Sequence, residues 1–192
     1  MSQLTAMNIL EKSKAVRDAL NSWLTVIAVI SAGIFGLVEY VDHKAGVRVE
    51  RSLGYVERYN GNVYLDSRAR LDEVLEEERE ALTALLTGEA LPSETIPRMY
   101  DDYVITMVDK HGIRPVLNRL FGFHEEVVLC ANAGLCDASV LQQFFSIEAQ
   151  ELFKGFYPYV CEQRNKWHNP ALFVRMEHFY LGSKRDVCAA GQ

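Results

Sequence analysis

The most distinctive pattern along this chain is an uncharged, apolar stretch near the N-terminus. Residues 20–38 hold no ionisable side chain, and these 19 residues at helical rise extend about 28 Å, close to the thickness of the hydrocarbon core of a bilayer. Trp23 and Tyr40 flank the stretch, at positions where amphipathic rings prefer a membrane interface. The pattern predicts a transmembrane helix over residues 20–41.

Two other interpretations of this stretch stay open. Ser31, Ala32 and Gly33 are small residues of the kind that a signal peptidase cleaves after, although cleavage there would leave the apolar residues 34–38 at the new N-terminus. A buried helix of a water-soluble protein would also be apolar, but it rarely needs an uncharged run of this length. The numbers of Lys and Arg on the two sides are balanced, so the charge rule gives no orientation.

Small residues recur at every fourth position of the same stretch, at Ala28, Ala32 and Gly36. This spacing places them on one face of a helix, where a second backbone can approach closely. They are therefore a candidate helix-packing seam. The alternative is that they have no specific partner, because Gly is frequent in membrane helices generally.

Beyond residue 42, apolar residues recur at helical spacing, and no segment alternates convincingly with the period of two that is typical of a strand. Asn60-Gly61, Gly88, Gly112, Pro115 and Gly134 are turn or cap signals that divide the pattern into separate helices. We predict an all-α fold, with one N-terminal transmembrane helix followed by a soluble bundle of five to six helices. The predicted organisation is an N-terminal segment over 1–19, the transmembrane helix over 20–41, a juxtamembrane helix over 42–61, a helical domain over 62–182 and a C-terminal tail over 183–192.

Composition and charge narrow the function classes. The chain of 192 residues carries 26 acidic against 20 basic side chains, a formal net charge of -6, and no basic patch is extensive enough to follow a nucleic-acid backbone. Acidic residues concentrate in the segment 73–80. We interpret this run as the solvated face of a helix rather than as a docking face for a basic partner or a divalent cation.

Four cysteines leave the redox compartment undecided. Cys130 and Cys136 flank the predicted helix stop at Ala133-Gly134, so the chain can turn back and bring their sulfurs within bonding range. In an oxidising compartment they would form a disulfide, and in a reducing one they would be small buried hydrophobic residues. Neither they nor the histidines have the paired spacing of a metal site, and we predict no metal and no cofactor.

Few residues point to chemistry. Arg164 is a candidate partner for Glu125, Glu126 or Asp137 on a neighbouring helix, in an ion pair that fixes helix register or in a pocket between aromatic helices. The chain contains no glycine-rich phosphate loop and no nucleophile elbow. We therefore expect no catalytic residues, and the enzyme assignment is left open with a noncatalytic role favoured.

Several motifs occur in a familiar order. They are "RVERSLGYVERYN", "RLFGFHEEVVLCANAGLCDASVLQQFF" and "YPYVCEQRN", which follow the N-terminal apolar helix. This order resembles an uncharacterised family of bacterial single-pass membrane-anchored proteins that share a helical domain of unknown function, most strongly over about residues 113–180. The resemblance implies an anchored helical module in a bacterial inner membrane, and it brings no catalytic residues.

The sequence supports two hypotheses of different classes. The first is a membrane-anchored noncatalytic interaction or accessory subunit, whose partners are the lipid bilayer and other membrane protein subunits, or a second copy of itself through the transmembrane helix. The second is a membrane-tethered ligand sensor or enzyme, with a pocket between aromatic helices near Glu125, Glu126 and Arg164. Neither hypothesis involves nucleic acid.

Overall fold

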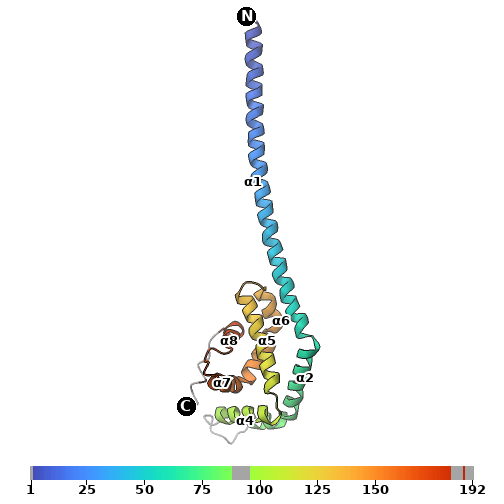
Figure 1. Cartoon of the computed structure of the whole chain (residues 1–192), viewed down its shortest axis with the longest axis vertical. Coiled ribbons are helices and arrows are strands. Elements are labelled where there is room, and N and C mark those ends of the chain that lie inside the picture. The colour runs from blue at the N-terminus through green and yellow to red at the C-terminus, as the bar shows by residue number, and fades with distance from the viewer. Residues whose placement is uncertain (1, 88–95, 183–187, 189–192) are drawn as a thin grey trace. The chain divides into compact units, whose positions relative to one another are not determined.

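The structure, a computed structural model, describes the backbone of residues 2–87, 96–182 and 188, and the side chains of residues 23–85, 87, 98–182 and 188. These residues form eight α-helices and no strand, which confirms the predicted all-α fold with an apolar N-terminal helix followed by a helical bundle (Figure 1). The helices are α1 (Ser2–Tyr59), α2 (Asn62–Glu77), α3 (Arg79–Thr87), α4 (Ile96–Lys110), α5 (Arg114–Asn132), α6 (Ala138–Gly155), α7 (Tyr157–Lys166) and α8 (Val174–Leu181).

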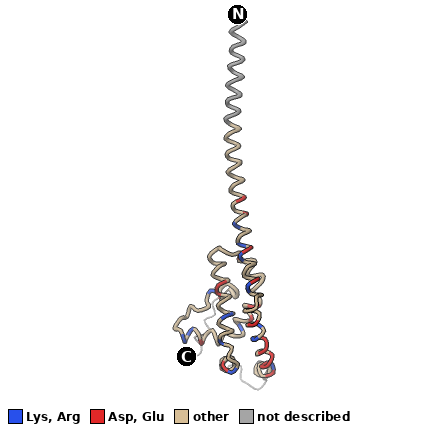
Figure 2. Tube along the Cα trace, turned by 45° about the vertical axis from the view of Figure 1, so that its right-hand side comes forward, with Lys and Arg blue, Asp and Glu red and all other residues tan. Residues whose placement is uncertain are grey.

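The chain divides into two compact units, residues 1–47 (unit 1) and residues 48–192 (unit 2). Unit 1 is helical throughout its described part, and its segment from Trp23 to Val38 carries no charged residue (Figure 2). By length and composition, α1 is the one helix in the described residues that is apolar enough to cross a membrane, with a mean hydropathy of 2.1 over its most apolar 18 residues. Helix α1 passes without interruption through both boundaries predicted for the membrane span, at residues 19 and 41, and ends at Tyr59.

Unit 2 is organised around α5. This helix contacts α2, α6 and α8 and lies between α2 and α8 (Figure 1). It buries seven residues, the most of any described helix, namely Leu117, Leu120, Phe121, Phe123, His124, Val127 and Val128. The stacking of Tyr59 on Phe123, with ring centroids 4.6 Å apart, joins the end of α1 to this core.

Local signals mark most of the helix ends. Asp137 caps α6 by accepting hydrogen bonds from the backbone N–H groups of Ser139 (2.9 Å) and Val140 (3.1 Å). Gly134 follows α5 with a φ of +66°, a left-handed conformation that glycine adopts without steric cost. These two residues place the turn between α5 and α6 where the sequence predicts it.

The segment 62–87 differs from the prediction, because it forms two helices rather than one. The break falls at Glu78, which lies between α2 and α3 and is only 8% exposed. A carboxylate that is enclosed in this way needs hydrogen-bond partners, and Tyr103 and Lys110 of α4 supply them. Tertiary contacts thus override the helical propensity of the acidic run.

The last helix, α8, starts at Val174, although a cap signal lies upstream at Asn169. Asn169 does accept a hydrogen bond from the Ala171 N–H group (3.0 Å), as a local cap would. However, Phe173 has a φ of +60°, and the carbonyl oxygen of Leu172 accepts a hydrogen bond from Arg164 Nε (2.8 Å). The buried arginine therefore takes a carbonyl group that a longer helix would have used.

Candidate functional site

The surface of unit 1 is the most apolar part of the described chain. Large side chains such as Trp23 (69% exposed) and Phe35 (74% exposed) have no protein cover. Ala28, Ala32 and Gly36 are exposed on the same helix, and a Cβ atom added at Gly36 would meet no other atom within 4 Å. The seam residues thus lie where a second helix could reach them.

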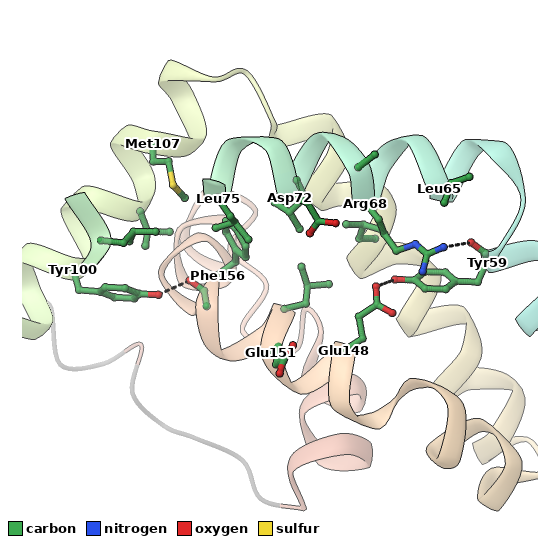
Figure 3. Close-up of a pocket in the computed structure, with 17 residues that line it drawn as sticks. Tyr59, Leu65, Arg68, Asp72, Leu75, Tyr100, Met107, Glu148, Glu151 and Phe156 are labelled. Atoms are coloured by element: carbon green, nitrogen blue, oxygen red, sulfur yellow. Dashed lines mark hydrogen bonds between the residues drawn. The ribbon is translucent and has the colours of Figure 1, made fainter. Parts of the chain in front are cut away.

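A cavity of about 500 Å³ opens in unit 2, between α2 and α3 on one side and α4 and α6 on the other (Figure 3). Helix α2 contributes residues from successive turns because their spacing places them on one face. The apolar lining residues are Leu65, Ala69, Leu71, Leu75, Leu82, Val104, Met107, Leu120, Leu152 and Phe156. The Tyr100 hydroxyl closes one end by donating a hydrogen bond to the carbonyl oxygen of Gly155 (2.9 Å).

Charged side chains line the mouth of this cavity. Arg68 and Asp72 on α2 lie across the opening from Glu148 and Glu151 on α6 (Figure 3). Arg68 stacks on the Tyr59 ring, with its guanidinium carbon 4.5 Å from the ring centroid, and the Tyr59 hydroxyl donates a hydrogen bond to Glu148. Within the described part of the chain, Asp72 and Glu151 have no ion-pair partner.

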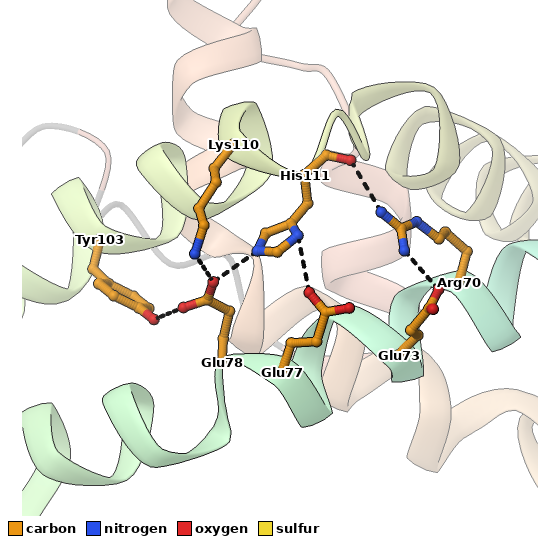
Figure 4. A network of polar contacts seen from close by, with 7 residues as sticks. All are labelled: Arg70, Glu73, Glu77, Glu78, Tyr103, Lys110 and His111. Atoms are coloured by element: carbon orange, nitrogen blue, oxygen red, sulfur yellow. Dashed lines mark hydrogen bonds and ion pairs between the residues drawn. The ribbon is translucent and has the colours of Figure 1, made fainter.

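A polar network surrounds Glu78 at the α2–α3 break (Figure 4). Its carboxylate accepts hydrogen bonds from Lys110 Nζ (2.6 Å) and from the Tyr103 hydroxyl, and it lies 2.7 Å from His111 Nε2. The bond from Lys110, followed by those from Tyr103 and His111, lowers the pKa of Glu78 to about 2. Because His111 Nδ1 is also 3.4 Å from Glu77, the two carboxylates hold this ring from both sides, and the network fixes α4 against the α2–α3 break.

The structure pairs all four cysteines in two disulfides. One joins Cys130 to Cys136, across the turn between α5 and α6. The other joins Cys161 on α7 to Cys188, at a sequence separation of 27. The second pair has no signal in the sequence, because no local turn brings Cys161 and Cys188 together.

The residues predicted to surround Arg164 have other partners. Glu126 pairs with Arg58 on α1, and Asp137 caps α6 as described above. Glu125 Oε1 accepts a hydrogen bond from the Met176 N–H group in the first turn of α8 (3.1 Å), and burial raises the pKa of Glu125. Of the three carboxylates, only Glu125 has a charge interaction with Arg164, so the three do not gather into one site.

Arg164 instead pairs with Glu177 on α8, a residue that the sequence analysis did not link to it. The guanidinium Nη2 lies 3.1 Å from Glu177 Oε2, and both side chains are almost fully buried. Since Arg164 also donates to the Leu172 carbonyl group, it joins α7 to α8. This buried pair links the two helices, and neither of its residues lines the cavity among α2, α3, α4 and α6.

His124 is the most isolated polar side chain of the core. It is 0% exposed, and its Nε2 has no hydrogen-bond partner in the described part of the chain. Its Nδ1 lies 3.5 Å from the Tyr180 hydroxyl, and the rings of Tyr59, Phe123, Phe145 and Tyr180 surround it. Burial lowers the pKa of His124 to about 3. The ring is therefore neutral at physiological pH.

Metal ligands do not gather in the residues that the structure describes, where no group of three or more His, Cys, Asp or Glu side chains could hold an ion. Comparison with known proteins gives a family and no assigned activity. The family profile described as a domain of unknown function (DUF4760) matches residues 25–183, which is most of the chain. The comparisons with curated proteins and with solved structures found no match to the chain.

Proposed function

The chain belongs to the DUF4760 family, and we propose that it is a membrane-anchored, noncatalytic interaction subunit of a larger membrane assembly. The observation that carries the proposal is the bare apolar surface of α1, of which none is buried within the protein over the most hydrophobic window. Residues 20–38 include ten Leu, Ile, Val or Phe side chains. At about 0.3 to 0.6 kcal/mol each, their insertion contributes roughly 3 to 6 kcal/mol in favour of a spanning helix.

The two disulfides support one orientation of this anchor. Disulfides form and persist in oxidising compartments and are rare in the cytosol, so unit 2 would lie on the outer side of the membrane. In the bacterial inner membrane that the family resemblance implies, this side is the periplasm. The cysteines thus indicate a side of the membrane for unit 2, whereas the balanced numbers of Lys and Arg around the anchor indicate none.

The interaction role rests on surfaces that α1 and unit 2 leave open. The seam of Ala28, Ala32 and Gly36 is exposed and free of bulky side chains, which suits close packing against a second membrane helix. On α6, Phe144 (52% exposed) and Ile147 (74% exposed) are three residues apart on the outside of the bundle. Together they support contact with partner subunits both within and outside the membrane.

The anchor and the disulfides, from which the side of the membrane is argued, are tested first. We expect the full-length chain to stay in the membrane fraction after alkaline extraction, with an N-terminal mass that includes residues 1–33. Without reductant, a thiol-specific label should react with none of the four cysteines, and after reduction and unfolding it should react with all of them. A mature chain that begins after Ser31-Ala32-Gly33, or one that is released without detergent, would refute the anchor.

The seam is tested by the double substitution Ala32→Leu/Gly36→Leu. After purification in mild detergent, native mass measurement of the wild type should give a complex larger than one chain. The double variant should give the single chain, because two leucines prevent close approach of the backbones. Gly33→Leu, one residue off the seam and equally exposed, is the matched control and should keep the complex. Equal assembly of all three proteins would show that the seam has no such role.

A further inference from the structure

We propose that the cavity between α2, α3, α4 and α6 binds a small amphipathic cation, that is, a molecule with an apolar body and a protonated amine. Its volume of about 500 Å³ lies within the range of sites that enclose small organic ligands. All of its lining residues belong to unit 2. The inference is therefore independent of the proposed membrane anchor.

The floor of the cavity is suited to the apolar body. Val104 and Met107 from α4, Leu120 from α5 and Phe156 after α6 are each at most 3% exposed, and none of them presents a charged or hydroxyl group to the cavity. Water against such a floor gains few hydrogen bonds, so an aliphatic or aromatic group that displaces it is favoured. Tyr100 limits the length of the ligand's apolar body at one end of the cavity, because its hydroxyl donates a hydrogen bond to the carbonyl oxygen of Gly155 and so fixes the ring.

The mouth supplies the charge selectivity. Asp72, Glu148 and Glu151 contribute three negative charges and Arg68 one positive charge, which leaves two negative charges around the opening. The guanidinium group of Arg68 is directed to the α1–α2 turn, because Nη2 lies 3.4 Å from both the Tyr59 carbonyl oxygen and Asn60 Oδ1. Asp72 and Glu151, exposed on facing helices and unpaired among the described residues, remain available to a bound ammonium group.

The test uses three soluble probes with the same body and different heads: 4-phenylbutylamine, 4-phenylbutan-1-ol and 4-phenylbutyrate. The full-length protein, in lipid nanodiscs and labelled with ¹³C at the methionine methyl groups, is titrated with each probe, and empty nanodiscs correct for partition into lipid. Met107 lines the cavity, whereas Met176 is fully buried in unit 2 and outside the cavity lining. The two methyl signals therefore report on the site and on the rest of the core.

We expect the amine to shift the Met107 signal and to leave the Met176 signal in place. The carboxylate probe should bind about tenfold more weakly than the amine at low salt, because the charged rim repels it. Equal or tighter binding of 4-phenylbutyrate would overturn the proposal. A Met107 signal that no probe moves, or Met107 and Met176 signals that move together, would overturn it as well.

Substitutions at the mouth separate charge from volume. Asp72→Asn/Glu151→Gln should lower the affinity for the amine about fivefold, since two partly exposed ion pairs together account for such a factor. Ala69→Trp should block the opening to all three probes. Asp66→Asn, an exposed acid on α2 outside the lining, is the matched control and should bind like the wild type. If the double variant binds the amine as tightly as the control, the charged rim selects no ligand and the proposal fails.

Discussion

Protonation of the buried His124 is expected to destabilise unit 2 in mild acid. In the folded state burial lowers its pKa to about 3, against an ordinary value of 6.5 in the unfolded chain. Between these two values the unfolded state binds more protons, so stability rises with pH across this window and falls as the pH is lowered. The contribution is fully present above pH 6.5 and is lost progressively below it.

The magnitude follows from the difference between the two states. Each pH unit below 6.5 costs about 1.4 kcal/mol while the folded-state ring stays neutral, which gives a loss of about 2 kcal/mol at pH 5. No discount for solvent screening applies, because the side chain is 0% exposed. The assay range from pH 5 to pH 6.5 lies above both pKa values of Glu78, which are about 2 in the folded state and 4.5 in the unfolded one.

The assay compares the full-length wild type with His124→Leu by urea unfolding in a nonionic detergent, followed by near-ultraviolet circular dichroism of the tertiary structure. The difference in unfolding free energy between the two proteins should change by about 2 kcal/mol between pH 6.5 and pH 5. Taking this difference cancels the opposing contribution of Glu125, whose pKa is raised by burial in both proteins.

Val128→Ala is the matched core control, because Val128 is fully buried in the same helix and carries no titrating group. Its free-energy difference from the wild type should be the same at both pH values. If His124→Leu also shows a pH-independent difference, then the imidazole ring is not held neutral in the core, and the argument from its burial is wrong.

Two further predictions concern the contacts that hold unit 2 together. Glu78→Gln should lower the unfolding free energy by roughly 2 kcal/mol at pH 7, because it weakens charge-assisted hydrogen bonds. This loss of stability should disappear as the pH falls from 4.5 toward 2. An unchanged urea midpoint at pH 7 would contradict the prediction. Replacing both cysteines of the Cys161–Cys188 bond by alanine should cost about 3.5 kcal/mol, against about 2 kcal/mol for the Cys130–Cys136 bond, because the longer loop loses more constraint on the unfolded chain. The reverse order in thermal unfolding would refute the loop-entropy explanation.

Sequence reasoning succeeds where a local signal decides the structure. Gly134 turns the chain by its own conformational freedom, so the end of α5 is visible in a few neighbouring residues. The apolar stretch 20–38 is also a local signal, since its length and lack of charge are read directly from the sequence.

The features that the sequence does not predict depend on distant partners. The break at Glu78 needs Tyr103 and His111, which lie 25 and 33 positions along the chain. The pairing of Arg164 with Glu177 requires two short helices to pack side by side, and helical periodicity gives no information on that packing. The cavity is a further case, because its floor and mouth come from six helices whose arrangement sets its volume.

The bond between Cys161 and Cys188 determines how unit 2 would carry a mechanical load. A pull on the chain beyond Cys188 passes through a covalent link to α7, so α8, which lies inside the closed loop, is left unstretched. Without that link the same force would peel α8 away from α5 and α6, which it contacts only through noncovalent packing. Under reducing conditions, tension applied beyond Cys188 would therefore separate α8 from α5 and α6, whereas with the disulfide intact α7 bears that tension.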